Sequence, residues 1–291
     1  MRRERPPLGF VNILSLQSWV SYGHVGNAAA MFPLQRLGAE VWGVHTVQFS
    51  NHTGYGDWAG NVFDGRAISS LVGGIARRGV LGTCDGVLSG YLGGTDIGDA
   101  VLGAVRQVKE ANPHALYCCD PVIGDAGRVY VRAGIPEFLR GKALPAANIA
   151  APNAFELSLL SGCRCATLAE VKEAIGRVQA MGPHTVLVSG LRTEATPADA
   201  VDLVVGEAGA FHLLRTPLLP IAVNGAGDVL AALFLHHRLA TGTARPALER
   251  AASSLFGVIR RTVEEGTQEL EIIAAQEEFV LPSRRFTALP C

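Results

Sequence analysis

Residues 224–234 read Asn-Gly-Ala-Gly-Asp-Val-Leu-Ala-Ala-Leu-Phe, a glycine-bearing turn that leads directly into an apolar run. The run predicts a buried helix, and the small residues before it leave backbone N–H groups uncovered where that helix starts. Such N–H groups and the helix dipole both favour a bound anion. Asp228 can be an ordinary helix-start residue, because an acidic side chain in the first turn interacts well with the dipole. It can also be the base for a hydroxyl group beside a bound phosphoryl group, as phosphoryl transfer to an alcohol requires.

Outward from this turn, short apolar runs alternate with helical stretches along the chain. Strands are expected at residues 10–16, 41–47, 86–89, 115–119, 148–151, 185–189, 201–205 and 210–213. Helices are expected at residues 24–37, 67–77, 96–111, 154–161, 168–180, 226–239 and 246–264. This alternation is typical of βαβ units, and the apolar strands fit burial on both faces. The sequence therefore predicts a three-layer α/β/α sandwich with a mainly parallel central sheet.

Composition indicates how many domains the chain forms and which classes of partner it binds. The chain has 291 residues, 48% of them apolar, and no Pro/Gly/Ser-rich linker or charge run divides it, so a single domain over residues 1–291 is expected. The formal net charge is −1 and the two signs are well mixed. Neither nucleic acid nor a membrane surface is therefore an expected partner.

The cysteines and the N-terminus favour a cytoplasmic location. None of the six cysteines forms a CxxC pair, and together they do not supply well-spaced zinc ligands. Thiols of this kind fit a reducing compartment. The N-terminus, Met1-Arg2-Arg3-Glu4-Arg5, is basic, but the apolar stretch after it is interrupted by polar residues and no small-residue cleavage site follows. The longest later apolar run, residues 229–235, is too short to cross a bilayer.

Polar residues recur in the loops that follow the predicted strands. These positions are Gln17-Ser18, residues 51–55, Gly90-Tyr91, Asp120-Pro121, Pro152-Asn153 and residues 224–228. Because ligands of open α/β sheets bind beyond the carboxyl ends of the strands, we expect one site built from all these loops. The sequence contains neither GxxxxGK[ST] nor, after its first strand, GxGxxG, which argues against a P-loop enzyme and a dinucleotide-binding domain.

Two acidic segments each leave two interpretations open. Residues 120–125, Asp-Pro-Val-Ile-Gly-Asp, can form an ordinary turn or a site for a divalent cation, since Mg²⁺ prefers carboxylate oxygens. Asn153 and Glu156 have the spacing of a helix-capping box. The same two side chains can also face a magnesium ion or its water shell.

Residues 48–55, Gln-Phe-Ser-Asn-His-Thr-Gly-Tyr, combine aromatic rings, hydroxyl groups and a histidine in one loop, and Trp58 follows shortly. Such a loop suits a flat heterocyclic ligand that is held by stacking and a few hydrogen bonds. His24, His52 and the pair His236-His237 are better explained as structural, packing or solvent-facing residues than as catalytic ones.

Together these motifs resemble the ribokinase-like superfamily and, within it, the pyridoxal (pyridoxine/pyridoxamine) kinases. The resemblance runs from about Val11 to the region of Glu271. It rests on Leu16-Gln17-Ser18, Gly23-His24-Val25-Gly26-Asn27, residues 47–55, Leu88-Ser89-Gly90-Tyr91, Cys119-Asp120-Pro121-Val122 and Ala151-Pro152-Asn153. The Gly-Ala-Gly-Asp element is common to the superfamily, whereas residues 48–55 point to the vitamin B6 kinases.

The resemblance implies transfer of the γ-phosphoryl group of ATP to the 5′-hydroxymethyl group of pyridoxal, and of pyridoxine or pyridoxamine, in vitamin B6 salvage. Asp228 would deprotonate the hydroxymethyl group, while the amides of Gly225, Ala226 and Gly227 would hold the transferring phosphoryl group. The vitamer-binding residues that the resemblance implies are Ser18, Val25, Thr53, Gly54, Trp58, Tyr91 and Asp228.

For the nucleotide, the resemblance implies Asp120, Ala151, Asn153, Glu156, Ser189, Thr216 and Leu218. Asp120 and Glu156 would also organise Mg²⁺, with Asp125 nearby and an activating K⁺ as a further expectation. Tyr130 would belong to a short lid loop near residues 121–133. The family is typically homodimeric.

Two alternatives stay open at this point. A hydroxymethylpyrimidine kinase shares the fold and the reaction, but usually has a cysteine where this chain has Asp228. A non-catalytic B6-binding protein is favoured by Ser189, which stands where these kinases often carry a Lys or Thr. Asp228 beside an anion site argues against such a pure binder.

Overall fold

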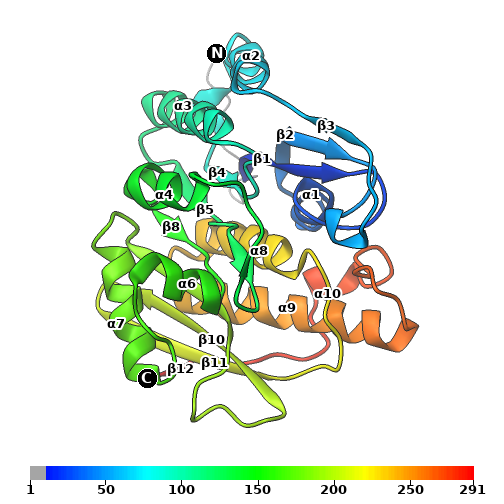
Figure 1. The fold of residues 1–291 in the computed structure, drawn as a ribbon, viewed down its shortest axis with the longest axis vertical. Helices are drawn as coiled ribbons and strands as arrows, with labels where there is room; N and C mark the ends of the chain where they lie inside the picture. The colour runs from blue at the N-terminus through cyan, green and yellow to red at the C-terminus, as the bar shows by residue number, and fades with distance from the viewer. Residues whose placement is uncertain (1–10) are drawn as a thin grey trace.

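The computed structural model describes residues 11–291 (Figure 1). The basic segment Met1-Arg2-Arg3-Glu4-Arg5 and the first residue of the strand expected at 10–16 lie outside the described residues. A ten-stranded sheet organises the described part of the chain. In spatial order its strands are β12 (Leu289–Pro290), β11 (Ala210–Pro217), β10 (Ala200–Glu207), β9 (Thr185–Leu191), β8 (Ile149–Ala150), β5 (Leu116–Cys119), β4 (Gly86–Ser89), β1 (Asn12–Val20), β2 (Glu40–Phe49) and β3 (Gly60–Val62).

The central strands, from β9 across to β2, are parallel, as the sequence predicts. The two margins are antiparallel: β10, β11 and β12 extend one side and β3 extends the other. A separate hairpin, β6 (Gly124–Asp125) with β7 (Arg128–Val129), stands apart from this sheet.

Helices cover both faces of the sheet and complete the three predicted layers (Figure 1). One face carries α1 (Asn27–Arg36), α8 (Ala226–Thr241), α9 (Ala244–Glu265) and α10 (Glu277–Val280). The other face carries α2 (Gly65–Ala76), α3 (Thr95–Ala111), α4 (Ile135–Phe138), the π-helical η3 (Leu139–Ala143), α5 (Leu144–Ala146), α6 (Ala154–Ser161) and α7 (Leu168–Gln179). Two short 3₁₀ turns, η1 (Thr53–Tyr55) and η2 (Leu81–Thr83), lie in connections.

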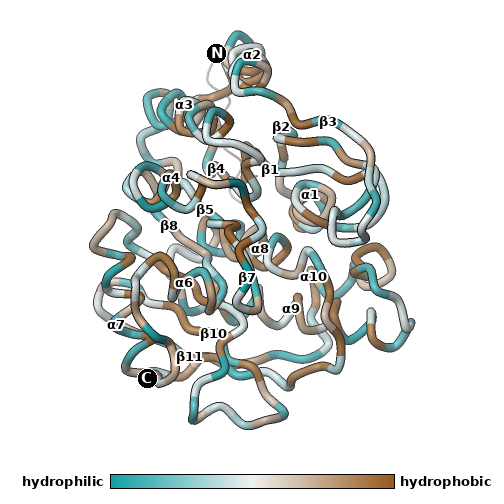
Figure 2. The backbone as a smooth tube through the Cα atoms, viewed as in Figure 1, coloured by the Kyte–Doolittle hydropathy of each residue, from teal (hydrophilic) through white to brown (hydrophobic). Residues whose placement is uncertain are grey.

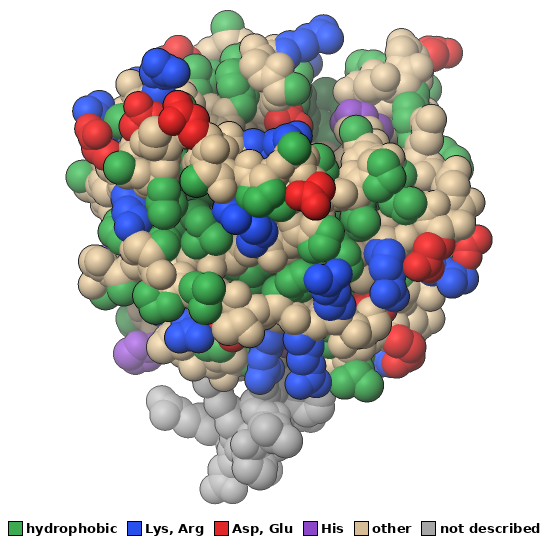
Figure 3. Space-filling view, turned by 90° about the horizontal axis from the view of Figure 1, so that it is seen from below, with side chains coloured by type: hydrophobic (Ala, Val, Ile, Leu, Met, Phe, Trp, Pro, Cys, Tyr) green, Lys and Arg blue, Asp and Glu red, His purple; other side chains and the backbone are tan. Residues whose placement is uncertain are grey.

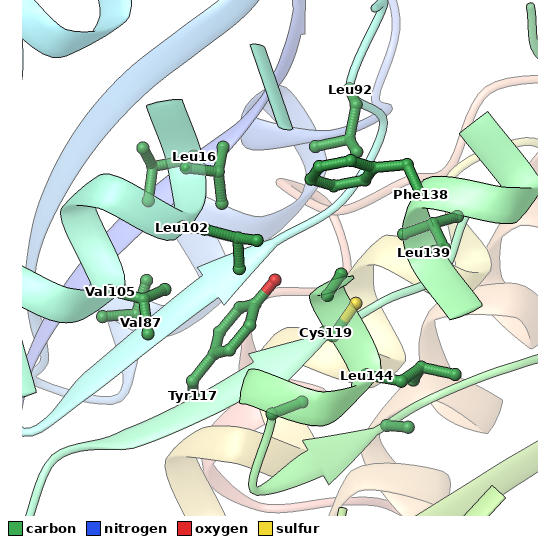
Figure 4. Close-up of a cluster of buried hydrophobic side chains, with 14 of the residues drawn as sticks. Leu16, Val87, Leu92, Leu102, Val105, Tyr117, Cys119, Phe138, Leu139 and Leu144 are labelled. Atoms are coloured by element: carbon green, nitrogen blue, oxygen red, sulfur yellow. The ribbon is translucent and has the colours of Figure 1, made fainter. Parts of the chain in front are cut away.

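Two hydrophobic cores, one on each face, hold the layers together. In β1, Ile13 belongs to the core under α8 and α9, whereas Leu14 and Leu16 belong to the core under α2 and α3. Figure 4 shows part of this second core, where Tyr117 of β5 points at Leu102 of α3. In Figure 2, strands near the centre of the molecule contain brown, hydrophobic stretches, as expected for a sheet covered on both faces.

Strand β1 differs from the prediction, because it continues through the expected loop at Gln17-Ser18 to Val20. Two polar side chains of this strand, Ser15 and Gln17, are buried and hydrogen-bonded. Ser15 Oγ donates to Asn27 Oδ1 (2.7 Å), and Gln17 Nε2 donates to Ser15 Oγ (3.0 Å). Polar residues that suggest a loop therefore belong to a strand, and a hydrogen bond to Asn27 of α1 allows Ser15 to be buried there.

The remaining boundaries shift by a few residues, and several short elements were not predicted. Helix α1 begins at Asn27 rather than near His24, because Gly23 and Gly26 have positive φ angles of 89° and 55°. The elements without a sequence prediction are β3, β6, β7, β12, α4, α5, α10 and the three η turns. Each of these is short, so it carries little periodic pattern.

The histidine pair and the cysteines have environments that the sequence predicts for them. His236 and His237 are buried in α8, as packing residues would be. All six cysteines are free, and Cys84, Cys118 and Cys119 are buried. On the face shown in Figure 3, basic and acidic side chains are both present. Within residues 11–291, no helix has the length and apolar character needed to cross a membrane.

Candidate active site

A cavity of about 730 Å³ opens at the carboxyl ends of the parallel strands, where the sequence predicts the site. Sheet order arranges its lining. The ends of β1, β2 and β4 supply one side of the lining, and those of β8, β9 and β11 supply the other. Asp120 follows β5, which lies between β4 and β8, so this carboxylate separates the two sides.

Nearly all site residues predicted from the sequence line this one cavity. They are Ser18, Val25, Thr53, Gly54, Tyr91, Asp120, Ala151, Asn153, Glu156, Ser189, Thr216, Leu218, Gly225, Ala226, Gly227 and Asp228, together with Asp125 and Tyr130. Trp58 does not line it. Its ring lies over Phe49, with ring centroids 4.3 Å apart, and Phe49 is the residue that reaches the cavity.

The two glycines of the turn at residues 224–228 have different surroundings. Gly225 precedes α8 with a φ of 85°, and a Cβ there would lie 1.9 Å from the carbonyl oxygen of His24. A Cβ on Gly227 would meet nothing within 4 Å, because this residue faces the open cavity. No side chain caps the start of α8. The first N–H groups of the helix are thus available to an anion in the cavity.

Three carboxyl groups that line the cavity, those of Asp120, Glu156 and Asp228, interact with one another. Asp120 and Glu156 are only 6% and 3% exposed. Burial raises the pKa of Asp120 well above its ordinary value, and the charges of Glu156 and Asp228 raise it further. Burial also raises the pKa of Glu156 to about 7 and that of Asp228 to about 6. Crowded, desolvated carboxylates of this kind are stabilised by a cation.

Glu156 confirms the capping box predicted for α6. Its backbone N–H donates to Asn153 Oδ1 (2.9 Å), and its Oε2 accepts from the Asn153 amide (2.9 Å). Oε1 accepts from the amides of Ile123 (2.8 Å) and Gly124 (3.3 Å), which fixes the base of the β6–β7 hairpin.

A metal ion bound here would lie next to a Glu156 carboxylate that already accepts hydrogen bonds from three backbone amides. Across residues 11–291, no three or more His, Cys, Asp or Glu side chains form a group that could hold a metal ion. The pair Asp120 and Glu156 fits an ion bound largely through water and phosphate oxygens, which is the usual mode for Mg²⁺.

The β6–β7 hairpin presents Asp125, Arg128 and Tyr130 to the cavity. Its tight turn places Ala126 and Gly127 at φ values of 49° and 80°, a conformation typical of two-residue hairpin loops. Arg128 is the only Lys or Arg among the lining residues, and it forms no ion pair with any described residue.

Sequence reasoning missed two charged residues of this region. Arg128 lies within the predicted lid loop, but nothing in the local pattern distinguishes it from Arg132. Glu269 lies outside the cavity lining and bonds to residues 214 and 245 positions earlier in the chain, a separation that no local pattern reveals.

The chain is similar to several known proteins. A family model described as phosphomethylpyrimidine kinase matches residues 83–272. The pyridoxal kinase PdxY of Granulibacter bethesdensis is 58% identical over 287 residues, covering 97% of this chain and 100% of that protein. The pyridoxal kinase PdxY of Rubrobacter xylanophilus is 51% identical over 280 residues, covering 96% of this chain and 97% of that protein.

A solved structure, the pyridoxal kinase of Leishmania donovani in complex with ADP and pyridoxamine, superposes with a TM-score of 0.89 at 30% identity. The match covers 96% of this chain and 99% of that one. With identity above half over nearly the full length of curated relatives, the chain belongs to the pyridoxal kinase family of ribokinase-like enzymes.

Proposed function

We propose that this chain transfers the γ-phosphoryl group of ATP to the 5′-hydroxymethyl group of pyridoxal, which gives pyridoxal 5′-phosphate and ADP. The observation that carries the proposal is the position of Asp228. It stands in the first turn of α8, at the cavity wall, directly after the uncapped amides of residues 225–227. An anion site next to a base is the arrangement that phosphoryl transfer to an alcohol needs.

The two sides of the cavity differ in a way that suits two substrates. Next to β1, β2 and β4, hydroxyl groups of Ser18 and Thr53 lie among Val25, Phe49 and Tyr91, which suits a polar aromatic ring. On the side of β10 and β11, the lining is largely apolar and would receive the adenine base. Its members are Val201, Leu203, Leu218, Ile221, Leu255, Phe256 and Ile259.

The reaction then follows from the groups between the two sides. Asp228, with its pKa near 6, is mostly ionised at neutral pH and takes the proton of the hydroxymethyl group. The oxygen attacks the γ-phosphorus, the bond to the β–γ bridging oxygen breaks, and ADP leaves. The amides of residues 225–227 stabilise the charge on the transferring group. Asp120 and Glu156 would hold Mg²⁺, which would supply positive charge next to the phosphates.

The β6–β7 hairpin has two roles in the proposed reaction, phosphate binding and exclusion of water. Arg128 would contact the nucleotide phosphates and thereby provide the positive charge that Ser189 lacks. The β6–β7 hairpin and Tyr130 would close over the reacting groups and exclude water. A single kinase domain over residues 1–291, a cytoplasmic location, a homodimer and an activating K⁺ stay predictions of the sequence.

The pyrimidine kinase alternative is weaker for a specific reason. The phosphomethylpyrimidine kinase model matches residues 83–272, so Ser18, Val25 and Thr53 lie outside the matched region. The Granulibacter bethesdensis and Rubrobacter xylanophilus relatives, which match 97% and 96% of this chain, are named pyridoxal kinases, and the Leishmania donovani enzyme is described with pyridoxamine and with pyridoxine.

A coupled ADP-release assay with Mg-ATP and K⁺ tests the proposal. Pyridoxal, pyridoxine, pyridoxamine and hydroxymethylpyrimidine are compared side by side. We expect turnover of at least one B6 vitamer, with pyridoxal the best. Turnover of the pyrimidine alone would keep the kinase chemistry and refute the substrate. Pyridoxal binding without any turnover would favour the non-catalytic binder.

A further inference from the structure

Glu269 lies in the connection that follows α9, outside the cavity, yet it contacts both loops that border the ring side. One loop is the segment after β1 that contains His24, and the other is residues 50–58, here called the ring-side loop. Thr53 and Gly54 of the ring-side loop line the cavity, as does Val25 next to His24. Tyr55 lies at the exposed edge of the ring-side loop.

The carboxylate of Glu269 uses both of its oxygens in these contacts. Oε2 accepts from the backbone N–H of His24 (2.8 Å), and Oε1 accepts from the hydroxyl group of Tyr55. Gly23 allows this close approach, since a Cβ there would lie 2.5 Å from either carboxylate oxygen. The bond to Glu269 is the main cause of the rise in the pKa of Tyr55 to about 12.

The segment around Glu269 is itself held in place. Thr267 Oγ1 donates to the carbonyl oxygen of Glu269 (2.9 Å), and the next residue, Leu270, is 1% exposed in the core under α8. Leu270 Cδ1 lies 3.5 Å from the position that a Cβ on Gly225 would occupy. The carboxylate thus connects the ring-side loop to a fixed part of the fold that abuts the anion-binding turn.

Ion pairing does not explain these contacts. Glu269 forms no ion pair with any Lys, Arg or His among residues 11–291. Its partners are a phenol and a backbone amide, one on each of the two loops. Hydrogen bonds to an ionised carboxylate are stronger than neutral ones, so they suit the task of fixing two loops.

We infer that Glu269 is a positioning residue for the vitamer: its hydrogen bonds to Tyr55 and to the His24 amide hold the two ring-side segments in the geometry that binds the substrate ring. This inference rests on the proposed function, because the proposed function assigns the vitamer to the ring-side segments. Glu269 itself touches no reacting atom.

Steady-state kinetics of Glu269→Ala, Glu269→Gln and Tyr55→Phe test this inference. Glu269→Ala should raise the KM for pyridoxal about tenfold, with the KM for ATP within twofold of wild type. Tyr55→Phe removes one of the two bonds and should give a smaller rise. Adding it to Glu269→Ala should cause no further rise, since the bond is already gone. Glu269→Gln keeps an acceptor oxygen and should fall between wild type and the alanine variant.

Glu271→Ala is the matched control, because the Glu271 carboxylate makes no hydrogen bond or ion pair with a described residue; it should leave both KM values unchanged. A pyridoxal KM within twofold of wild type in Glu269→Ala would overturn the inference. An equal rise in both KM values would also overturn it, since that pattern indicates general loss of structure.

Amide hydrogen exchange of the ligand-free protein separates this inference from the proposed function. Residues 50–58 should exchange faster in Glu269→Ala than in wild type, with the core strands unchanged. Unchanged exchange in this segment would refute the positioning role. If wild type phosphorylates no B6 vitamer, the proposed function fails and exchange alone decides whether Glu269 holds the loop.

Discussion

Replacing Gly227 with alanine would test the anion-binding turn without disturbing the fold. The added Cβ meets no protein atom within 4 Å and projects into the cavity, where the transferring phosphoryl group would sit. Alanine is a better helix former than glycine by up to about 1 kcal/mol, so the protein should be as stable as wild type or slightly more stable. Loss of one hydrogen-bond donor to a developing charge costs about 10²–10³-fold in kcat. The alanine keeps its N–H and only obstructs the phosphoryl group in part, so we expect a smaller loss of about 10–100-fold in kcat/KM for ATP.

Gly225→Ala is the contrasting variant, two positions earlier in the same turn. Its φ of 85° is left-handed, which costs an alanine about 1–2 kcal/mol, and its Cβ would collide with the carbonyl oxygen of His24 at 1.9 Å. At about 2–4 °C per kcal/mol, the Tm should fall by at least about 2–8 °C.

Differential scanning calorimetry and initial-rate assays on the two variants distinguish the two roles of the turn. The reasoning predicts that Gly227→Ala keeps its Tm and loses activity, whereas Gly225→Ala loses stability. Wild-type kcat/KM in Gly227→Ala would refute the anion site at this turn. A fall in Tm as large as that of Gly225→Ala would refute the claim that the Gly227 position faces open space.

Two further predictions concern charged and buried groups. In initial-rate assays, Arg128→Gln should raise the KM for ATP about tenfold and leave the KM for pyridoxal within twofold. The reason is that it removes the only Lys or Arg that lines the described cavity. Arg132→Gln is the control, because Arg132 lies outside the lining. Burial lowers the pKa of His236 to about 4 and that of His237 to about 3, so below about pH 6.5 the unfolded chain binds more protons than the folded protein and stability falls with decreasing pH. Between pH 7.5 and 5.5, the free energy of unfolding measured in urea should fall by about 1.4 kcal/mol more in wild type than in His237→Gln. The carboxylates contribute equally to both proteins, so their effect cancels in this difference. An equal fall in the two proteins would contradict the buried, neutral state of His237.

Sequence reasoning located those elements whose limits are set by local chemistry. Helix α6 has its predicted bounds because the Asn153–Glu156 capping box starts it and Gly162, with a φ of 71°, ends it. Strand β4 also has its predicted bounds, since its short apolar run is followed by glycine. The carboxyl-end rule placed most of the predicted site residues around one cavity, because it depends only on strand direction.

Features that depend on distant partners could not be predicted in this way. Gln17 looks like a loop residue, but its Nε2 donates to Ser15 Oγ, and Ser15 Oγ donates to Asn27 of α1. Trp58 is an aromatic residue of the kind that lines ligand pockets, but its ring packs on Phe49, and Phe49 lines the cavity. Glu269 becomes meaningful only when the fold brings it to Tyr55 and His24.

The central claim is that Asp228 is the base for the vitamer hydroxyl group, and Asp228→Asn tests it most directly. The variant keeps the size of the side chain and removes its capacity to accept the proton. With Mg-ATP and pyridoxal, formation of pyridoxal 5′-phosphate should fall about 10²–10⁴-fold in kcat, while the Kd for pyridoxal from calorimetry stays within a few-fold of wild type. A kcat within tenfold of wild type would contradict the account and assign the base to another group.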